Sequence, residues 1–192
     1  DTIDRWFPEA PNGSKITVQM LLEHESGLYE LDMSLVGVAS NRAVIANVFA
    51  QAPIAEPGTT YQYLNAGYIL LGQIAEDAGK KPYGDQVKAR FIDALGLTHT
   101  YLDGHGKGPE AVIGYELACS GATGSDCLGK PSTPQQVDPS PQWTGAWSAG
   151  GMVSTARDQA VWIRALVAGD VVDDKHKRLM RDLTDASSAY YD

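Results

Sequence analysis

Tyr63 and Asn65 lie two residues apart in the stretch PGTTYQYLNAGY (residues 57–68), directly before an apolar helical pattern. A phenol with an unperturbed pKa near ~10 can move protons at neutral pH only where neighbouring cations stabilise its anion. An asparagine amide offers one donor and one acceptor, which together match a substrate amide. The structural alternative is that the tyrosine packs and Asn65 caps the helix. These residues alone leave both interpretations open.

A histidine between two carboxylates, Glu23-His24-Glu25, has the residue types of a metal site. Consecutive helical residues point in different directions, so these three side chains cannot converge on one ion. We therefore expect no metal site here.

The stretch AWSAGG (residues 146–151) nearly matches the Gly-x-Ser-x-Gly turn that presents a nucleophilic serine, with Ala146 in place of the first glycine. That turn needs a buried apolar strand before the serine and a helix directly after it. The preceding PSPQWTG is no strand, so the sequence disfavours Ser148 as a nucleophile.

Helices must position these residues. Helical patterns cover residues 17–24, 41–51, 66–79, 82–96 and 154–169, and a weaker one covers 173–183. The pattern over 66–79 is the clearest: Leu70, Leu71, Ile74 and Ala78 form one apolar stripe, and Gly79 ends it. The chain is predicted to be a single, mainly α-helical domain over residues 1–192 with little β-sheet.

Residues 98–147 lack sustained periodicity and are rich in Gly, Pro and Ser, with room for short strands at HTYLD and AVIGYEL. A loop of this length in a compact domain is usually functional, so we expect it to form the rim of a cleft. Trp143 and Trp147 are candidate substrate-binding residues there, and core packing is an equal alternative for both.

Cys119 and Cys127, the two cysteines, are predicted to form a disulfide, which favours an extracytoplasmic location, periplasmic or secreted.

The composition excludes several classes of partner. The net charge is −9, from 15 Lys and Arg against 24 Asp and Glu, and no basic stripe collects along the chain. This argues against nucleic acid and anionic membrane surfaces. The longest apolar runs are far shorter than the roughly 20 residues of a membrane span. The first residue is Asp1 and no signal peptide pattern follows it, so we expect a processed or truncated product.

Three ordered blocks give the chain a family resemblance. ITVQMLLEHESGL (16–28), PGTTYQYLNAGYILLGQIAE (57–76) and WSAGGMVSTARDQAVWIRAL (147–166) resemble the penicillin-recognising serine hydrolases, which include D-alanyl-D-alanine carboxypeptidases, class C β-lactamases and related esterases. The resemblance covers nearly the whole chain and implies the helical domain of the β-lactamase/DD-peptidase fold.

The resemblance also implies roles for two residues. The tyrosine of Tyr-x-Asn is the family's general acid/base, and the asparagine amide holds the substrate's carbonyl. These positions are Tyr63 and Asn65, with Leu64 where the family usually has serine. The substrate would be a small molecule or peptide with an amide, β-lactam or ester carbonyl, and no cofactor is implied.

Two elements of the family are missing from this sequence. No serine is followed three residues later by lysine, and no Lys-Thr-Gly or His-x-Gly segment follows the last helical pattern. We therefore expect a fragment that is inactive by itself, whose partner is the missing α/β domain of the same protein. The alternative is a non-catalytic binding or regulatory module derived from that fold.

Overall fold

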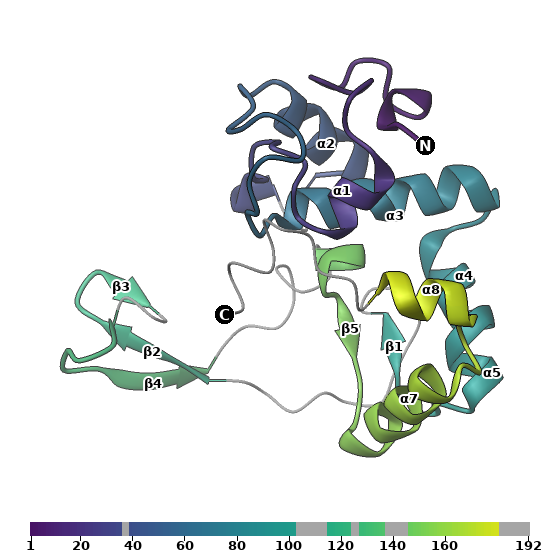
Figure 1. The fold of residues 1–192 in the computed structure, drawn as a ribbon. Helices are drawn as coiled ribbons and strands as arrows, with labels where there is room; N and C mark the ends of the chain where they lie inside the picture. Colours follow the sequence, from purple (N-terminus) through teal and green to yellow (C-terminus); the bar gives the residue numbers. More distant parts are fainter. Residues whose placement is uncertain (36–38, 103–114, 124–126, 137–145, 181–192) are drawn as a thin grey trace.

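The computed structural model describes residues 1–35, 39–102, 115–123, 127–136 and 146–180. The helices are α1 (Val18–Leu22), α2 (Asn41–Phe49), α3 (Asn65–Gly79), α4 (Tyr83–Val87), α5 (Asp93–Leu95), α7 (Ala156–Ala168) and α8 (Asp174–Leu179), with shorter turns at Ile3–Arg5, Met33–Leu35 and Trp147–Ala149. The strands are β1 (Tyr101–Leu102), β2 (Tyr115–Cys119), β3 (Ala122–Thr123), β4 (Thr133–Gln136) and β5 (Met152–Val153). The mainly helical fold predicted from the sequence is confirmed (Figure 1).

Several helices begin where the sequence places a capping hydroxyl. Thr17 accepts the N–H of Met20 at the start of α1, and Ser40 accepts that of Ala43 at the start of α2. Thr155 caps α7 in the same way. Each hydroxyl satisfies a backbone donor that the first helical turn leaves unpaired.

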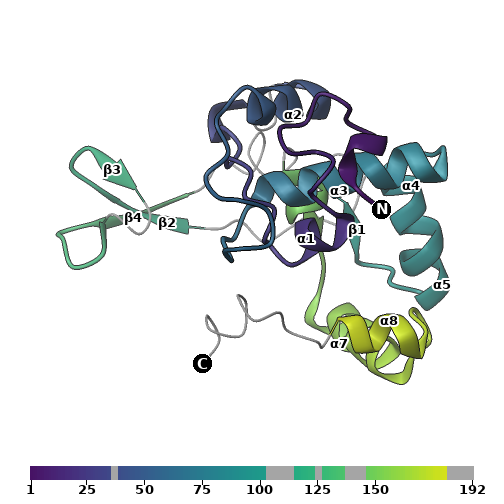
Figure 2. The same cartoon turned by 45° about the horizontal axis from the view of Figure 1, so that its top comes forward.

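The hydrophobic core forms around α3, which packs against α1, α2, α4 and the Trp147–Ala149 turn. In both ribbon views α3 crosses the helical body, with α1 and α2 at its N-terminal half and α4 at its far end (Figures 1 and 2). The core side chains that are almost fully buried include Ile3, Phe7, Ile16, Leu21, Leu28, Val48, Ile69 and Leu70. The central helix thus fixes the positions of the elements on either side of it.

The buried face of α3 differs in detail from the predicted stripe. Leu70 and Ile74 are buried as expected, but Leu71 is only partly buried and Ala78 is exposed. Ile69 is buried instead. The core contacts α3 on two sides near the middle of the helix, whereas the last turn is exposed to solvent. The buried positions of α3 therefore do not follow a single four-residue period.

The predicted continuous helix over residues 82–96 is interrupted. α4 runs into a π-helical segment at Lys88–Ile92, and α5 then ends at Gly96 in the left-handed region. The side chains keep a helical spacing, but the wider π-helical turn moves them around the axis. The predicted glycine stop is confirmed.

Two small antiparallel sheets form in and just after residues 98–147, and the short strands expected at HTYLD and AVIGYEL correspond to β1 and to part of β2. β1 pairs with β5, joining Tyr101 to Val153. β2 lies between β3 and β4, and this three-stranded sheet projects away from the helical body (Figure 1). The predicted Cys119–Cys127 disulfide is present and ties the end of β2 to the segment before β4. No helix in the described ranges is long and apolar enough to cross a membrane.

Candidate active site

Tyr63 and Asn65 lie side by side at the N-terminus of α3. Asn65 is the first residue of the helix, and Leu64 before it has an extended backbone. The Tyr63 hydroxyl donates to Oδ1 of Asn65 over 3.3 Å, and the Tyr63 side chain is 60% exposed. A phenol and an amide therefore meet at an accessible surface, as a pair that handles a substrate must.

Glu30 holds the amide of Asn65 in place. Its Oε2 accepts the backbone N–H of Asn65 at 2.9 Å and the side-chain Nδ2 of the same residue at 3.3 Å. Its Oε1 accepts the N–H of Ala66 at 3.0 Å and that of Leu31 at 2.7 Å. Because Nδ2 faces Glu30, Oδ1 is the amide atom that faces the Tyr63 hydroxyl.

The same carboxylate caps α3. Leu64, in the N-cap position, has no side chain that can accept a hydrogen bond. Glu30, 35 residues before Asn65, satisfies the first N–H groups instead, and its negative charge is favourable at the positive end of the helix. Asn65 is therefore not the cap of α3, and its side chain instead donates to Glu30 and accepts the Tyr63 hydroxyl.

His24 supports the tyrosine side of the pair. It has a left-handed backbone with φ of 60°, and its Nδ1 accepts the N–H of Leu64 at 3.1 Å. Its ring lies 4.6 Å from that of Tyr63 and 5.1 Å from that of Tyr68, centroid to centroid, and is stacked on Tyr68. Burial lowers the pKa of His24, and the charge of Glu30 partly opposes this shift. An unprotonated Nδ1 is what the bond from Leu64 requires.

The residues around His24 do not form a metal centre. Within the ranges that the structure describes, no three His, Cys, Asp or Glu side chains are grouped to hold an ion. The ring nitrogen Nδ1 is occupied by the backbone of Leu64.

Ser148 is part of the packing against α3. Its hydroxyl donates to the backbone carbonyl of Tyr68 over 2.8 Å, from the short turn Trp147–Ala149. The close approach depends on Gly72, where an added Cβ would lie 2.6 Å from the Trp147 ring. The hydroxyl proton is thus used in a structural hydrogen bond.

Trp147 is partly buried and packs against the core, with its ring edge-to-face to Tyr83 at 5.2 Å. These are the contacts of a packing residue, which was the alternative that the sequence left open. Its role in substrate binding remains a prediction. Trp143 lies outside the described residues.

Sequence reasoning missed the two residues that fix the pair. His24 stood out only as a metal candidate, although its place beside a glycine turn in the first family-like block was a usable signal. Glu30 gave no local signal, because its partners lie 35 and 36 residues away.

An exposed Tyr-x-Asn pair at the start of a central helix, in a mainly helical domain, is the arrangement that the resemblance to the penicillin-recognising serine hydrolases implies. The chain belongs to the Beta-lactamase family, whose model matches residues 1–190.

Solved structures and curated relatives agree with this assignment. The D-amino acid amidase of Ochrobactrum anthropi SV3 is 31% identical with a TM-score of 0.77, over 93% of this chain and 51% of that one. A D-stereospecific amidohydrolase from Streptomyces sp. is 25% identical with a TM-score of 0.80, over 99% of this chain and 59% of that one. The putative penicillin-binding protein PbpX of Bacillus subtilis (strain 168) is 26% identical, over 100% of this chain and 45% of its own length. The chain thus spans about half the length of these relatives.

Proposed function

We propose that this chain forms the helical wall of the active site of a serine hydrolase that cleaves amide bonds through an acyl-enzyme. The observation that carries the proposal is the hydrogen-bonded pair of Tyr63 and Asn65 at the exposed N-terminus of α3. The nucleophilic serine and its lysine would come from a part of the protein outside these 192 residues.

In this reaction the serine oxygen attacks the substrate's carbonyl carbon, and the serine proton passes to the Tyr63 phenolate. The carbonyl carbon's bond to nitrogen then breaks, and Tyr63 returns the proton to the leaving amine. Water next attacks the ester, again through Tyr63, and releases the acid and the free serine. Asn65 would hold the substrate through its amide, with the orientation set by Glu30.

The relatives favour an amide as substrate. Two of the structural neighbours are named as a D-amino acid amidase and a D-stereospecific amidohydrolase. We therefore place D-configured amides or peptides first among the substrates, ahead of β-lactams and esters. The Cys119–Cys127 disulfide supports an extracytoplasmic location, because such bonds persist in oxidising compartments.

The test uses the protein translated from the complete reading frame. Tyr63→Phe removes the proton carrier and should lower kcat/KM for a D-amino acid amide by about 10²- to 10⁴-fold. Tyr61→Phe is the matched control, since it removes a phenol hydroxyl two residues away in the same loop. A Tyr63→Phe enzyme as active as the Tyr61→Phe enzyme would exclude the proposed role of Tyr63.

A non-catalytic binding module is the second candidate, because the 192 residues contain no Ser-x-x-Lys. Sequencing the reading frame upstream and downstream of these 192 residues distinguishes the enzyme from the binding module. A Ser-x-x-Lys upstream and a Lys-Thr-Gly-like segment downstream support the enzyme, and their absence supports the module.

A further inference from the structure

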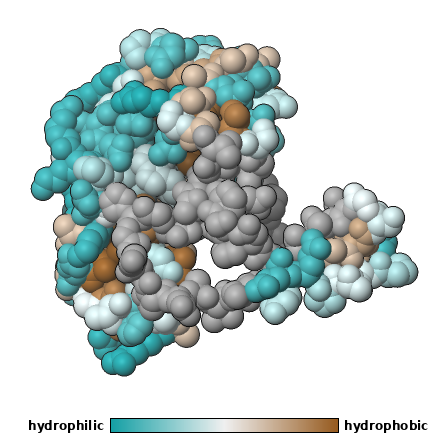
Figure 3. Space-filling view, turned by 180° about the vertical axis from the view of Figure 1, so that it is seen from behind, coloured by the Kyte–Doolittle hydropathy of each residue, from teal (hydrophilic) through white to brown (hydrophobic). Residues whose placement is uncertain are grey.

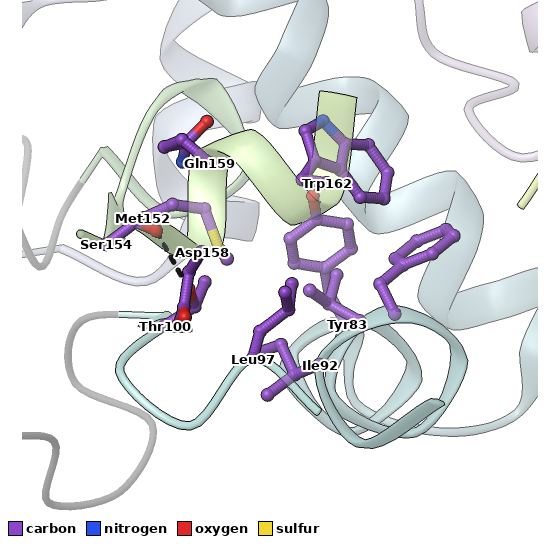
Figure 4. Close-up of a pocket in the computed structure, with 11 residues that line it drawn as sticks. Tyr83, Ile92, Leu97, Thr100, Met152, Ser154, Asp158, Gln159 and Trp162 are labelled. Carbon is purple, nitrogen blue, oxygen red and sulfur yellow. Dashed lines mark hydrogen bonds between the residues drawn. The ribbon is translucent and has the colours of Figure 1, made fainter. Parts of the chain in front are cut away.

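A cavity of about 280 Å³ lies at the far end of α3 from Tyr63 and Asn65. Neither Tyr63 nor Asn65 is among the described residues that line it. Figure 4 shows the cavity between α7, the α4–α5 segment and the strands β1 and β5. Hydrophobic side chains gather over this corner in the space-filling view of Figure 3. It is thus separate from the candidate active site.

The walls of the cavity are aromatic and aliphatic. The apolar and aromatic lining residues are Tyr83, Val87, Phe91, Ile92, Leu97, Met152 and Trp162. Phe91 and Trp162 meet edge-to-face, with ring centroids 5.3 Å apart. Burial raises the pKa of Tyr83, so its phenol stays neutral and adds no negative charge to the wall.

One end of the cavity is polar and is organised around Asp158, which is 5% exposed. Its Oδ2 accepts the N–H of His99 and the hydroxyl of Thr100, each at 2.8 Å. The Thr100 proton is therefore used, so the 2.8 Å contact between Thr100 and Ser154 must be a donation by Ser154. The hydroxyl protons at this end all point away from the cavity, toward protein acceptors.

The second oxygen of Asp158, Oδ1, makes no hydrogen bond in the described part of the chain. Every fully buried side-chain nitrogen or oxygen there has a partner, so Oδ1 is not fully buried, and Asp158 is one of the residues that line the cavity. The polar lining thus offers two acceptors, the free oxygen of Asp158 and the lone pairs of Ser154, together with the amide of Gln159, which can both donate and accept.

The charge at this end is negative. Asp158 lies in the first turn of α7, where the helix dipole and two donors stabilise its carboxylate. Among the described residues that line the cavity, no side chain is cationic, so the carboxylate has no ion-pair partner within these walls. A buried anion of this kind favours a ligand that carries a positive charge.

We propose that this cavity is a binding site for a small organic amine with an aromatic or branched aliphatic body. The ammonium group would donate to Oδ1 of Asp158 and to Ser154, and the body would lie in the cavity against the paired rings of Phe91 and Trp162. A dry cavity of about 150 Å³ holds benzene, so the larger volume here accommodates an arylethylamine.

The test compares 2-phenylethylamine with 2-phenylethanol, which has the same shape but no charge. Binding to the protein is measured by calorimetry and by the indole N–H signal of Trp162, assigned with Trp162→Phe. We expect the amine to bind at least about ten-fold more tightly than the alcohol. Asp158→Asn should remove this preference.

Asp158 also accepts hydrogen bonds from His99 and Thr100, so Asp158→Asn could disturb folding. A second variant that keeps Asp158 is therefore needed. Val87→Trp fills the cavity from its apolar side without touching the carboxylate and should abolish binding of both probes. Equal affinity for amine and alcohol would show a neutral apolar site and overturn the proposal. So would an absence of saturable amine binding, or amine binding that survives Val87→Trp. None of these outcomes depends on the role of Tyr63.

Discussion

The Nδ1 atom of His24 accepts the backbone N–H of Leu64, the residue between Tyr63 and Asn65. One imidazole therefore holds the backbone of the proposed catalytic pair, and it can do so only while Nδ1 carries no proton. The Tyr68 ring stacks on this imidazole and the Tyr63 ring lies tilted against it, and both contacts limit its movement.

This relationship predicts a pH-dependent stability. Burial lowers the pKa of His24 from its ordinary value of 6.5, so the unfolded chain binds more protons than the folded one. The contribution of His24 is therefore complete above pH 6.5 and is lost as the pH falls through that value toward the lower folded-state pKa. Urea unfolding across this range should show the loss.

His24→Asn is the matched control for this titration. Asparagine tolerates the left-handed backbone, and its Oδ1 can accept the Leu64 N–H without titrating. The variant should have a flatter stability profile between about pH 5 and 7. An unchanged profile would mean that another group causes the pH dependence.

Glu30→Ala should destabilise the protein by about 1–3 kcal/mol, because it leaves the N–H groups of Asn65 and Ala66 without their acceptor. Glu23→Ala, which removes a carboxylate bonded to Gln19 on the exposed surface, should change the free energy of unfolding by less than about 0.5 kcal/mol. Equal effects of the two substitutions would argue against Glu30 as the cap.

Leu70→Ala and Leu71→Ala test the observed face of α3. Leu70 is 0% exposed, so its truncation should cost about 2–5 kcal/mol. Leu71 is only partly buried, and its truncation should cost clearly less. Denaturant unfolding of both variants measures the difference, and the reverse order would mean that α3 is rotated about its axis.

The 192-residue chain by itself should form no covalent adduct with a reactive β-lactam. Acylation requires a nucleophile, a base that reaches it and donors aimed at the oxyanion, and by the family pattern this chain supplies the base, Tyr63. Ser148 already donates its proton to the carbonyl of Tyr68. Intact-protein mass spectrometry after incubation is the measurement, and a stoichiometric adduct on any serine would show that the nucleophile lies within this chain.

Much of the fold could be predicted because its signals are local. The capping hydroxyls of Thr17, Ser40 and Thr155 act within three residues, and Gly96 and Gly169 end their helices in left-handed conformations. The π-helical turn at Lys88–Ile92 leaves no such signal, because its residues have ordinary helical propensity.

The contacts around the candidate pair could be predicted only in part, and the roles of Tyr63 and Asn65 stay predictions. Tyr63 and Asn65 are recognisable by their spacing, and the structure confirms that they are adjacent. Glu30 and His24 act through partners 35 to 40 residues away, and no periodicity in the sequence encodes such a pairing. The contacts of Asp158 could not be predicted for the same reason, since its partner Thr100 lies 58 residues away in the sequence.

The carboxylate of Glu30 closes a loop of chain whose other end is Asn65. Closing this loop lowers the conformational entropy of the chain. The loop must close before the N–H groups in the first turn of α3 can bond to Glu30. That turn therefore cannot be complete until the chain from Glu30 to Asn65 has taken its place. Residues 30–65 and the first turn of α3 should therefore form and unfold as one cooperative unit. The surface that carries Tyr63 then exists only while this whole segment is folded.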